Sequence, residues 1–114
     1  MARIGNSLLS LGVVAAGAIT ANRFVGFDNN QASVQGQKVL GVAEYAASGG
    51  GQPVTLTAKG TAFVETGGVF NPGDLIIAGA DGRAMASAAG TDFIKGEALA
   101  ASTAAGQYVE ILLR

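Results

Sequence analysis

Residues 54–59 read Val54-Thr-Leu-Thr-Ala-Lys59, and apolar and polar residues alternate along this stretch. A similar alternation returns near the end of the chain, in Tyr108-Val-Glu-Ile-Leu-Leu113. A period of two residues is typical of β-strands that bury one face. Turn-forming residues separate such stretches, at positions 28–30, 49–51, 67–68, 71–74 and 81–82. Short strands at this spacing predict a mainly β fold, either a small β-barrel or a β-sandwich.

One hairpin and one helix can be placed more closely. Asp81-Gly82 lies between the apolar stretch 75–77 and residues 83–85, which predicts a β-hairpin. The stretch Ala84–Ala89 has moderate helix propensity and is followed by Gly90. We therefore expect at most one short helix, at this place.

The two halves of the chain resemble each other. Two such units packed face to face would close a small barrel and remove free strand edges. The similarity predicts repeats over about residues 20–58 and 71–113, whereas a chance match in a chain rich in Ala and Gly is the alternative. The matching segments are Gly41-Val-Ala43 with Gly96-Glu-Ala98, Gly51-Gln-Pro-Val54 with Gly106-Gln-Tyr-Val109, and, after a gap of four residues, Arg23-Phe-Val25 with Asp74-Leu-Ile76.

The composition excludes several classes of protein. A chain of 114 residues is long enough for one domain. It contains no Cys and no His, which excludes disulfide scaffolds, thiolate metal sites and His-based acid–base catalysis. Seven Lys and Arg residues against eight Asp and Glu residues are scattered along the chain, so it lacks the concentrated positive charge that nucleic acid requires.

No segment predicts catalysis, a cofactor or a metal. A Ser or Thr nucleophile would need a base within reach, yet no Ser-x-x-Lys motif occurs and the carboxylates stand singly. Asp74 follows Pro72-Gly73 and is better interpreted as a turn residue that bonds its own backbone. The glycines at 49–51 lack the Gly-Lys-Ser/Thr ending of a phosphate-binding loop. Residues 28–30 lack the bidentate Glu of a calcium loop.

The N-terminal segment allows three interpretations. Arg3 precedes a 12-residue apolar stretch, Leu8–Ile19, which is too short to span a bilayer as a helix. It is similar to a short secretory signal peptide with cleavage near Ala18. It could also form a strand or short helix in the protein's own core. We favour an extended arm over residues 1–17 that packs on another chain, followed by a single β domain over residues 18–114.

Several side chains are candidates for contacts with another chain. The apolar arm would lie on another protein or on a neighbouring subunit if the chain is part of an assembly. The two tyrosines favour an edge or interface, where the ring is buried and the hydroxyl stays paired. The candidate interface residues are Arg3, Ile4, Leu8, Leu9, Leu11, Val13, Val14, Tyr45 and Tyr108.

Short motifs along residues 18–113 give the chain a family resemblance. They are Arg23-Phe-Val25, Gly41-Val-Ala43, Val54-Thr-Leu-Thr57, Gly73-Asp-Leu75 and Val109-Glu-Ile-Leu112. In this order they resemble the small capsid cement, or head decoration, proteins of tailed double-stranded DNA bacteriophages.

The resemblance implies a function. It implies a non-enzymatic, β-barrel-like virion protein that forms homo-oligomers, commonly trimers. Such proteins bind the major capsid protein on the outer surface of the mature capsid, bridge neighbouring capsomers and stabilise the DNA-filled head. It implies no membrane, no direct contact with nucleic acid and no cofactor. A secreted or surface-exposed bacterial β-domain that binds a ligand or polymer is the alternative.

Overall fold

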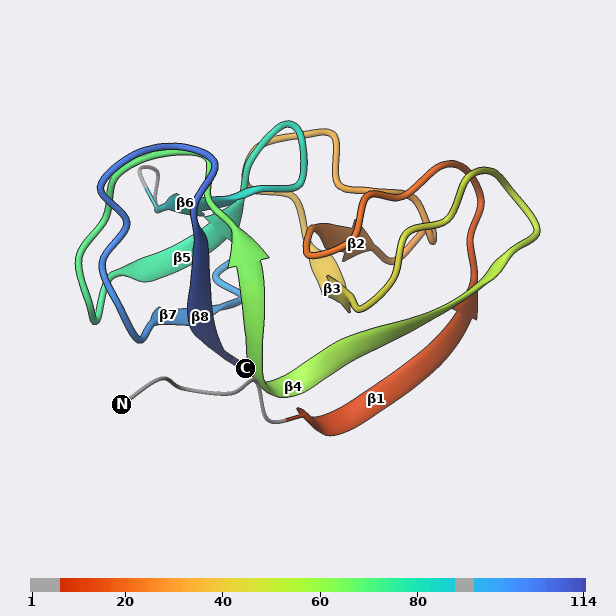
Figure 1. The fold of residues 1–114 in the computed structure, drawn as a ribbon, viewed down its shortest axis with the longest axis horizontal. Coiled ribbons are helices and arrows are strands. Elements are labelled where there is room, and N and C mark those ends of the chain that lie inside the picture. The colour runs from red at the N-terminus through yellow and green to blue at the C-terminus, as the bar shows by residue number, and fades with distance from the viewer. Residues whose placement is uncertain (1–6, 88–91) are drawn as a thin grey trace.

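The computed structural model describes residues 7–87 and 92–114, and all the regular structure in these ranges is β (Figure 1). The strands are β1 (Ser7–Val14), β2 (Phe24–Gly26), β3 (Val39–Ala43), β4 (Pro53–Glu65), β5 (Leu75–Ala78), β6 (Ala84–Ala86), β7 (Gly96–Ala98) and β8 (Tyr108–Leu113).

The long strand β4 connects the two parts of the sheet. Figure 1 shows it running beside β1, then turning sharply and continuing beside β8. Gly60 stands at this corner and is the partner of both Ser7 in β1 and Leu113 in β8. Its φ of 101° is a conformation that a residue with a Cβ rarely adopts. The corner therefore depends on glycine at this position.

The sheet nearly closes into a barrel. Its strand order is β2-β3-β4-β8-β7-β5-β6, with β1 joined to β4 beside this path. The Phe24 N–H at one end of the order donates a 2.8 Å hydrogen bond to the Gly82 carbonyl, next to the other end. The prediction of a small β-barrel is confirmed by this arrangement.

Two apolar clusters form the core. β2 and β3 contribute adjacent residues to different clusters, because successive side chains of a strand point to opposite faces. β4 instead contributes to the smaller cluster before Gly60 and to the larger cluster after it. The larger cluster contains Phe24, Ala32, Val39, Val42, Ala62, Val64, Phe70, Ile76, Ala78, Ala84, Ala98, Val109, Ile111 and Leu113. The smaller cluster contains Ala15, Ile19, Val25, Ala43, Ala47, Val54 and Leu56, with Val13 and Leu40 packed against it.

The same strand pairing occurs in both halves of the chain. Residues of β1 and β2 correspond to residues 51 positions later, and residues of β3 and the first half of β4 correspond to residues 55 positions later. The second half of β4 therefore has the position in its half that β1 has in the other. The corresponding pairs include Val13↔Val54 with Val64↔Val109, Phe24↔Val42 with Leu75↔Glu97, and Ala43↔Leu56 with Ala98↔Ile111.

The loops before β4 and β8 also use the same hydrogen bonds. The Gln52 side chain accepts from the Ser48 N–H and donates to the Ser48 hydroxyl, both at 2.8 Å. The Gln107 side chain bonds the N–H and the hydroxyl of Thr103 in the same way, at 2.9 and 2.8 Å. The Gly-Gln motif is thus a loop clamp in both halves.

The expected helix at Ala84–Ala89 is wrong for the residues that the structure describes. Ala84–Ala86 forms β6, which pairs antiparallel with β5 from Ile76 to Ala78. The predicted hairpin at Asp81-Gly82 is confirmed, with Gly82 at a φ of 81°. Pairing with a buried strand outweighs the weak helix propensity of a short Ala-rich stretch.

The extended N-terminal arm is also not supported. Ser7–Val14 forms β1, an antiparallel partner of β4, and Val13 packs against the smaller cluster. Ala15 and Ile19, which follow the strand, are buried. The apolar stretch is therefore part of the fold, which agrees with its interpretation as a strand of the protein's own core. Residues 1–6 lie outside the described residues.

Gly41 tests the close pairing of β3 with β4. A Cβ at Gly41 would lie 2.5 Å from the Thr57 carbonyl oxygen, in backbone that cannot move aside. We predict that Gly41→Ala lowers the free energy of unfolding by about 3 kcal/mol, as overpacking does in dense cores. Gly49→Ala is the control, because no atom lies within 4 Å of a Cβ there. Urea denaturation measures both, and equal stabilities would contradict the tight approach.

Glu65 joins the two halves through an ion pair on each carboxylate oxygen. Arg23 Nη2 lies 3.2 Å from its Oε1, and Arg83 Nη2 lies 3.0 Å from its Oε2. We predict that Glu65→Gln lowers the free energy of unfolding by about 2 kcal/mol, because two half-buried guanidinium groups lose their counter-charge. The control Glu97→Gln removes an exposed 3.5 Å pair with Arg114 and is expected to change stability by less than about 0.5 kcal/mol. Thermal denaturation compares the stabilities of the two variants. A larger loss of stability for Glu97→Gln than for Glu65→Gln would contradict the role of the Glu65 ion pairs.

Candidate interaction surface

The charged residues of the described chain serve the fold. No group of three or more Asp or Glu residues that could hold a metal occurs within residues 7–87 and 92–114. Asp74 Oδ2 accepts a 2.8 Å hydrogen bond from the Asn71 N–H, which places it in a turn as predicted. Burial, and then the positive charge of Lys59, lower the pKa of Lys95. The Lys95 ammonium donates a 3.0 Å hydrogen bond to the Arg114 carbonyl, so it anchors the end of β8.

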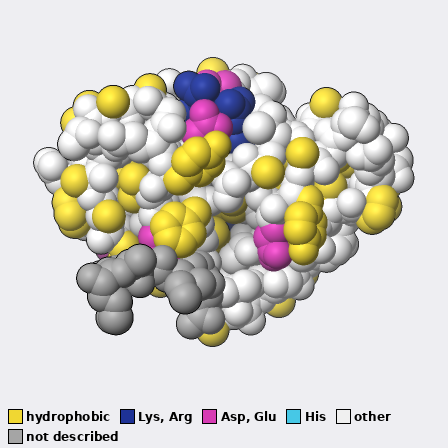
Figure 2. All heavy atoms as spheres, in the orientation of Figure 1, with side chains coloured by type: hydrophobic (Ala, Val, Ile, Leu, Met, Phe, Trp, Pro, Cys, Tyr) yellow, Lys and Arg dark blue, Asp and Glu magenta, His cyan; other side chains and the backbone are white. Residues whose placement is uncertain are grey.

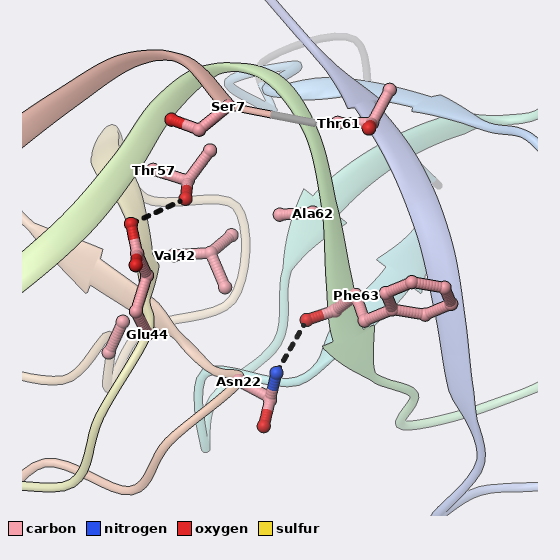
Figure 3. A pocket seen from close by; sticks show the side chains of 9 residues that line it. Ser7, Asn22, Val42, Glu44, Thr57, Thr61, Ala62 and Phe63 are labelled. Atoms are coloured by element: carbon pink, nitrogen blue, oxygen red, sulfur yellow. Dashed lines mark hydrogen bonds between the residues drawn. The ribbon is translucent and has the colours of Figure 1, made fainter. Parts of the chain in front are cut away.

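A pocket of about 250 Å³ lies at the corner of β4 (Figure 3). Its lining comes from both sides of the corner, with Thr57 from one half of β4 and Thr61, Ala62 and Phe63 from the other. The remaining lining residues are Ser7, Asn22, Val42, Ala43 and Glu44.

The polar groups of the pocket bond to one another. The Thr57 hydroxyl donates to Glu44 Oε2 at 3.1 Å, and the Asn22 amide donates to the Phe63 carbonyl at 3.0 Å. Figure 3 shows both bonds. Among the described residues that line the pocket, the one carboxylate is that of Glu44, which is exposed. The pocket suits the docking of a partner's side chain better than the chemistry of a small substrate.

Large apolar side chains of β1 face the solvent. Leu8 is 79% exposed and Val14 is 59% exposed, and Leu9 is also exposed. Leu11 and Val13 are half-buried. Arg3 and Ile4, the other candidates in this segment, lie outside the described residues. The structure thus brings five of the predicted contact residues onto one paired strand.

The two tyrosines are exposed at separate places. Tyr45 is 62% exposed in the loop after β3, and Tyr108 is 59% exposed at the start of β8. Leu8 and Tyr45 each directly follow a residue that lines the pocket, Ser7 and Glu44. Both residues are thus next in sequence to lining residues of the pocket, and their role in binding stays a prediction.

Several exposed apolar residues were missed from the sequence. Leu112 occupies a position of the polar face in the alternating stretch of β8, so the period of two residues could have shown that it faces outward. Lys38 Nζ lies 5.1 Å from the centre of the Phe27 ring, which partly covers an otherwise exposed aromatic side chain. The missed residues are Phe27, Val34, Val69, Leu75 and Leu112.

Charge is sparse on the face drawn in Figure 2. Basic and acidic side chains gather at the top, where the larger and smaller lobes meet, and few others interrupt the face. Ion pairs join four charged residues of the fold to one another, namely Arg23, Glu65, Asp81 and Arg83. Most of the other side chains on this face are uncharged or apolar, which suits contact with another protein.

No helix that is long and apolar enough to cross a membrane occurs in the part of the chain that the structure describes.

Comparisons with known proteins give the fold and the family. No curated protein matches the sequence. The structure is similar to the crystal structure of the head fiber gp8.5 N base in bacteriophage phi29, with a TM-score of 0.74 and 19% sequence identity over 93% of each chain. This similarity shows a shared fold. The sequence model of the phage cement protein matches residues 3–114, which confirms the resemblance of the short motifs, and the chain belongs to the phage cement protein family.

Proposed function

We propose that the chain binds the outer surface of the mature phage capsid and bridges neighbouring capsomers. Membership of the phage cement protein family gives the chain a structural role in the phage capsid. The observation that carries the finer proposal is the set of large apolar side chains held exposed on the barrel, among them Leu8 and Tyr45. An interface core needs such anchors, and rigid strands hold them at little entropic cost.

The physics of a filled head explains why such a protein would bridge capsomers. Packed DNA presses outward, so a bridging protein must resist the separation of neighbouring subunits. Several binding sites on one oligomer act together, and modest contacts per subunit then give strong retention. We therefore propose a homo-oligomer, with a trimer as the leading candidate, whose partner is the major capsid protein.

The alternative of a secreted or surface-exposed bacterial β-domain has no observation in its favour. It interprets the apolar stretch 8–19 as a signal peptide that is cut near Ala18. In the structure this stretch contains β1 and two buried residues of the smaller cluster, Ala15 and Ile19. Cleavage there would remove a strand from the sheet.

The first test is binding to heads. The purified protein is mixed with mature phage heads that lack it and, separately, with unexpanded proheads, and both are sedimented. We predict co-sedimentation with mature heads only, because expansion creates the bridged site. Equal binding to proheads would contradict a site made by expansion, and binding to neither would contradict the capsid role.

Point variants test where the capsid binds. We predict that Leu8→Ser and Tyr45→Ser each weaken retention on mature heads about tenfold, because each removes a large exposed apolar anchor. Val69→Ser is the matched control, since Val69 is equally exposed on a loop that does not line the pocket. Retention is measured by quantitative gel after sedimentation. A loss for Val69→Ser and none for the other two would move the contact elsewhere.

A further inference from the structure

The contact between the two halves of the chain is one-sided. The first half presents Phe24 and Val42, which join the larger cluster together with Ala62 and Val64 of the second half of β4. Asn22 adds two hydrogen bonds to the same strand. Its carbonyl accepts from the Glu65 N–H at 2.9 Å, and its side-chain amide donates to the Phe63 carbonyl at 3.0 Å. The surface of the first half at Asn22, Phe24 and Val42 thus covers the second half of β4, and the two halves use different surfaces for this contact. The sequence predicted that they pack face to face.

The covered strand has an uncovered counterpart. β1 corresponds to the second half of β4 in the pairing of the two halves, so Leu11 and Val13 correspond to Ala62 and Val64. Val64 is fully buried, but Leu11 and Val13 are only half-buried. Among the described residues β1 pairs with β4 alone, and its other edge has no strand partner. An open edge of this kind readily accepts another chain.

The covering surface has an uncovered counterpart as well. Phe24 corresponds to Leu75, and Val42 corresponds to Glu97. Thr57, the β4 partner of Val42, corresponds to Leu112. Leu75 is 43% exposed on β5 and Leu112 is 44% exposed on β8. These two strands flank β7, where Glu97 is the partner of both residues. Asn22 corresponds to Gly73, and both have a left-handed backbone, with φ of 63° and 87°. A Cβ at Gly73 would meet no atom within 4 Å, so this position is open.

We propose that a second copy of this chain binds here, head to tail. The outer wall at Gly73, Leu75 and Leu112 of one copy covers β1 of the next, and so repeats between copies the contact that joins the two halves within one chain. A second copy fits because it carries both sides of this contact. The inference deepens the proposed function, since it assigns surfaces to the proposed homo-oligomer.

The internal contact indicates which groups meet between copies. Because Glu65 accepts the Arg23 guanidinium, the corresponding residues Val14 and Asp74 lie opposite each other in the proposed interface. The Val14 N–H corresponds to the Glu65 N–H and would donate to the Gly73 carbonyl, as Glu65 does to Asn22. The two copies contact each other through different surfaces, so the interface is heterologous. In an open assembly one end copy has a free β1 and the other a free outer wall, until a closed ring pairs them.

Self-association of the full chain, measured by sedimentation equilibrium without heads, tests the proposal. Gly73→Asn supplies the side-chain amide of Asn22 and is expected to strengthen association about tenfold, because Asn tolerates the left-handed backbone and gains a bond across the interface. Gly106→Asn is the control, since Gly106 has a φ of 88° and equally open space. The control is expected to leave association unchanged.

Charge changes at Val14 test the facing residue. Val14→Glu sets a second carboxylate against Asp74 and is expected to weaken association about tenfold, whereas Val14→Lys provides a partner and is expected to retain or strengthen it. Leu112→Glu removes the opposite side of the contact. A mixture of Val14→Glu and Leu112→Glu still holds one intact pair of surfaces, so we expect dimers in the mixture where each variant alone is monomeric.

The possible outcomes separate this inference from the capsid role. A wild-type chain that stays monomeric at every concentration, a mixture that does not form dimers, or equal effects of Val14→Glu and Val14→Lys would each overturn the head-to-tail contact. Sedimentation with heads measures the capsid role in a separate experiment. Loss of head binding with intact self-association would overturn the capsid role alone.

Discussion

The fold depends on one strand that serves two sets of partners. β4 pairs with β1 and β3 along its first half and with β8 along its second, and it can do so only because the backbone turns at Gly60. If this strand of 13 residues were straight, its partners β1 and β8 would lie one after the other along it. The corner instead folds the second half over the back of β3, and the larger cluster fills the space between them. The barrel, the pocket inside the corner and the Glu65 ion pairs all follow from this turn.

The one-sided packing of the two halves explains where the molecule is incomplete. The first half closes the barrel with the face that carries Phe24 and Val42, so the corresponding face of the second half remains on the outside. The same asymmetry leaves β1 covered on one edge only. Leu75, Leu112 and Val14 are therefore exposed for the same reason, since each corresponds to a residue that the internal contact buries or bonds. Exposed apolar residues with a common cause differ from those scattered singly over a surface.

The sequence predicted the fold better than the site. Alternation in β4 and β8 is a local signal, and so is the Asp81-Gly82 turn, and both led to the correct class. β6 and β1 were misinterpreted because their state depends on long-range partners, β5 and β4, that no local pattern contains. Leu8 and Tyr45 are exposed, and their contacts with another chain stay a prediction. Nothing in the sequence showed that Ser7 and Glu44, which precede them, line one pocket. That pocket exists only once the corner of β4 brings Thr57 and Phe63 together.

A protein that works by adhesion faces a conflict between binding and solubility. It must expose apolar groups and an open strand edge, and both also favour aggregation. This chain limits the hazard in two ways. The register shifts near Leu9 interrupt the regular edge of β1, and an irregular edge is a poor template for indiscriminate pairing. Its apolar anchors are also divided between β1, the loop at Tyr45 and the outer wall, so no single continuous patch collects them. A partner that matches all of these surfaces gains from each contact at once, whereas a chance partner meets only one, and selectivity for a defined lattice can arise in this way without a reactive group.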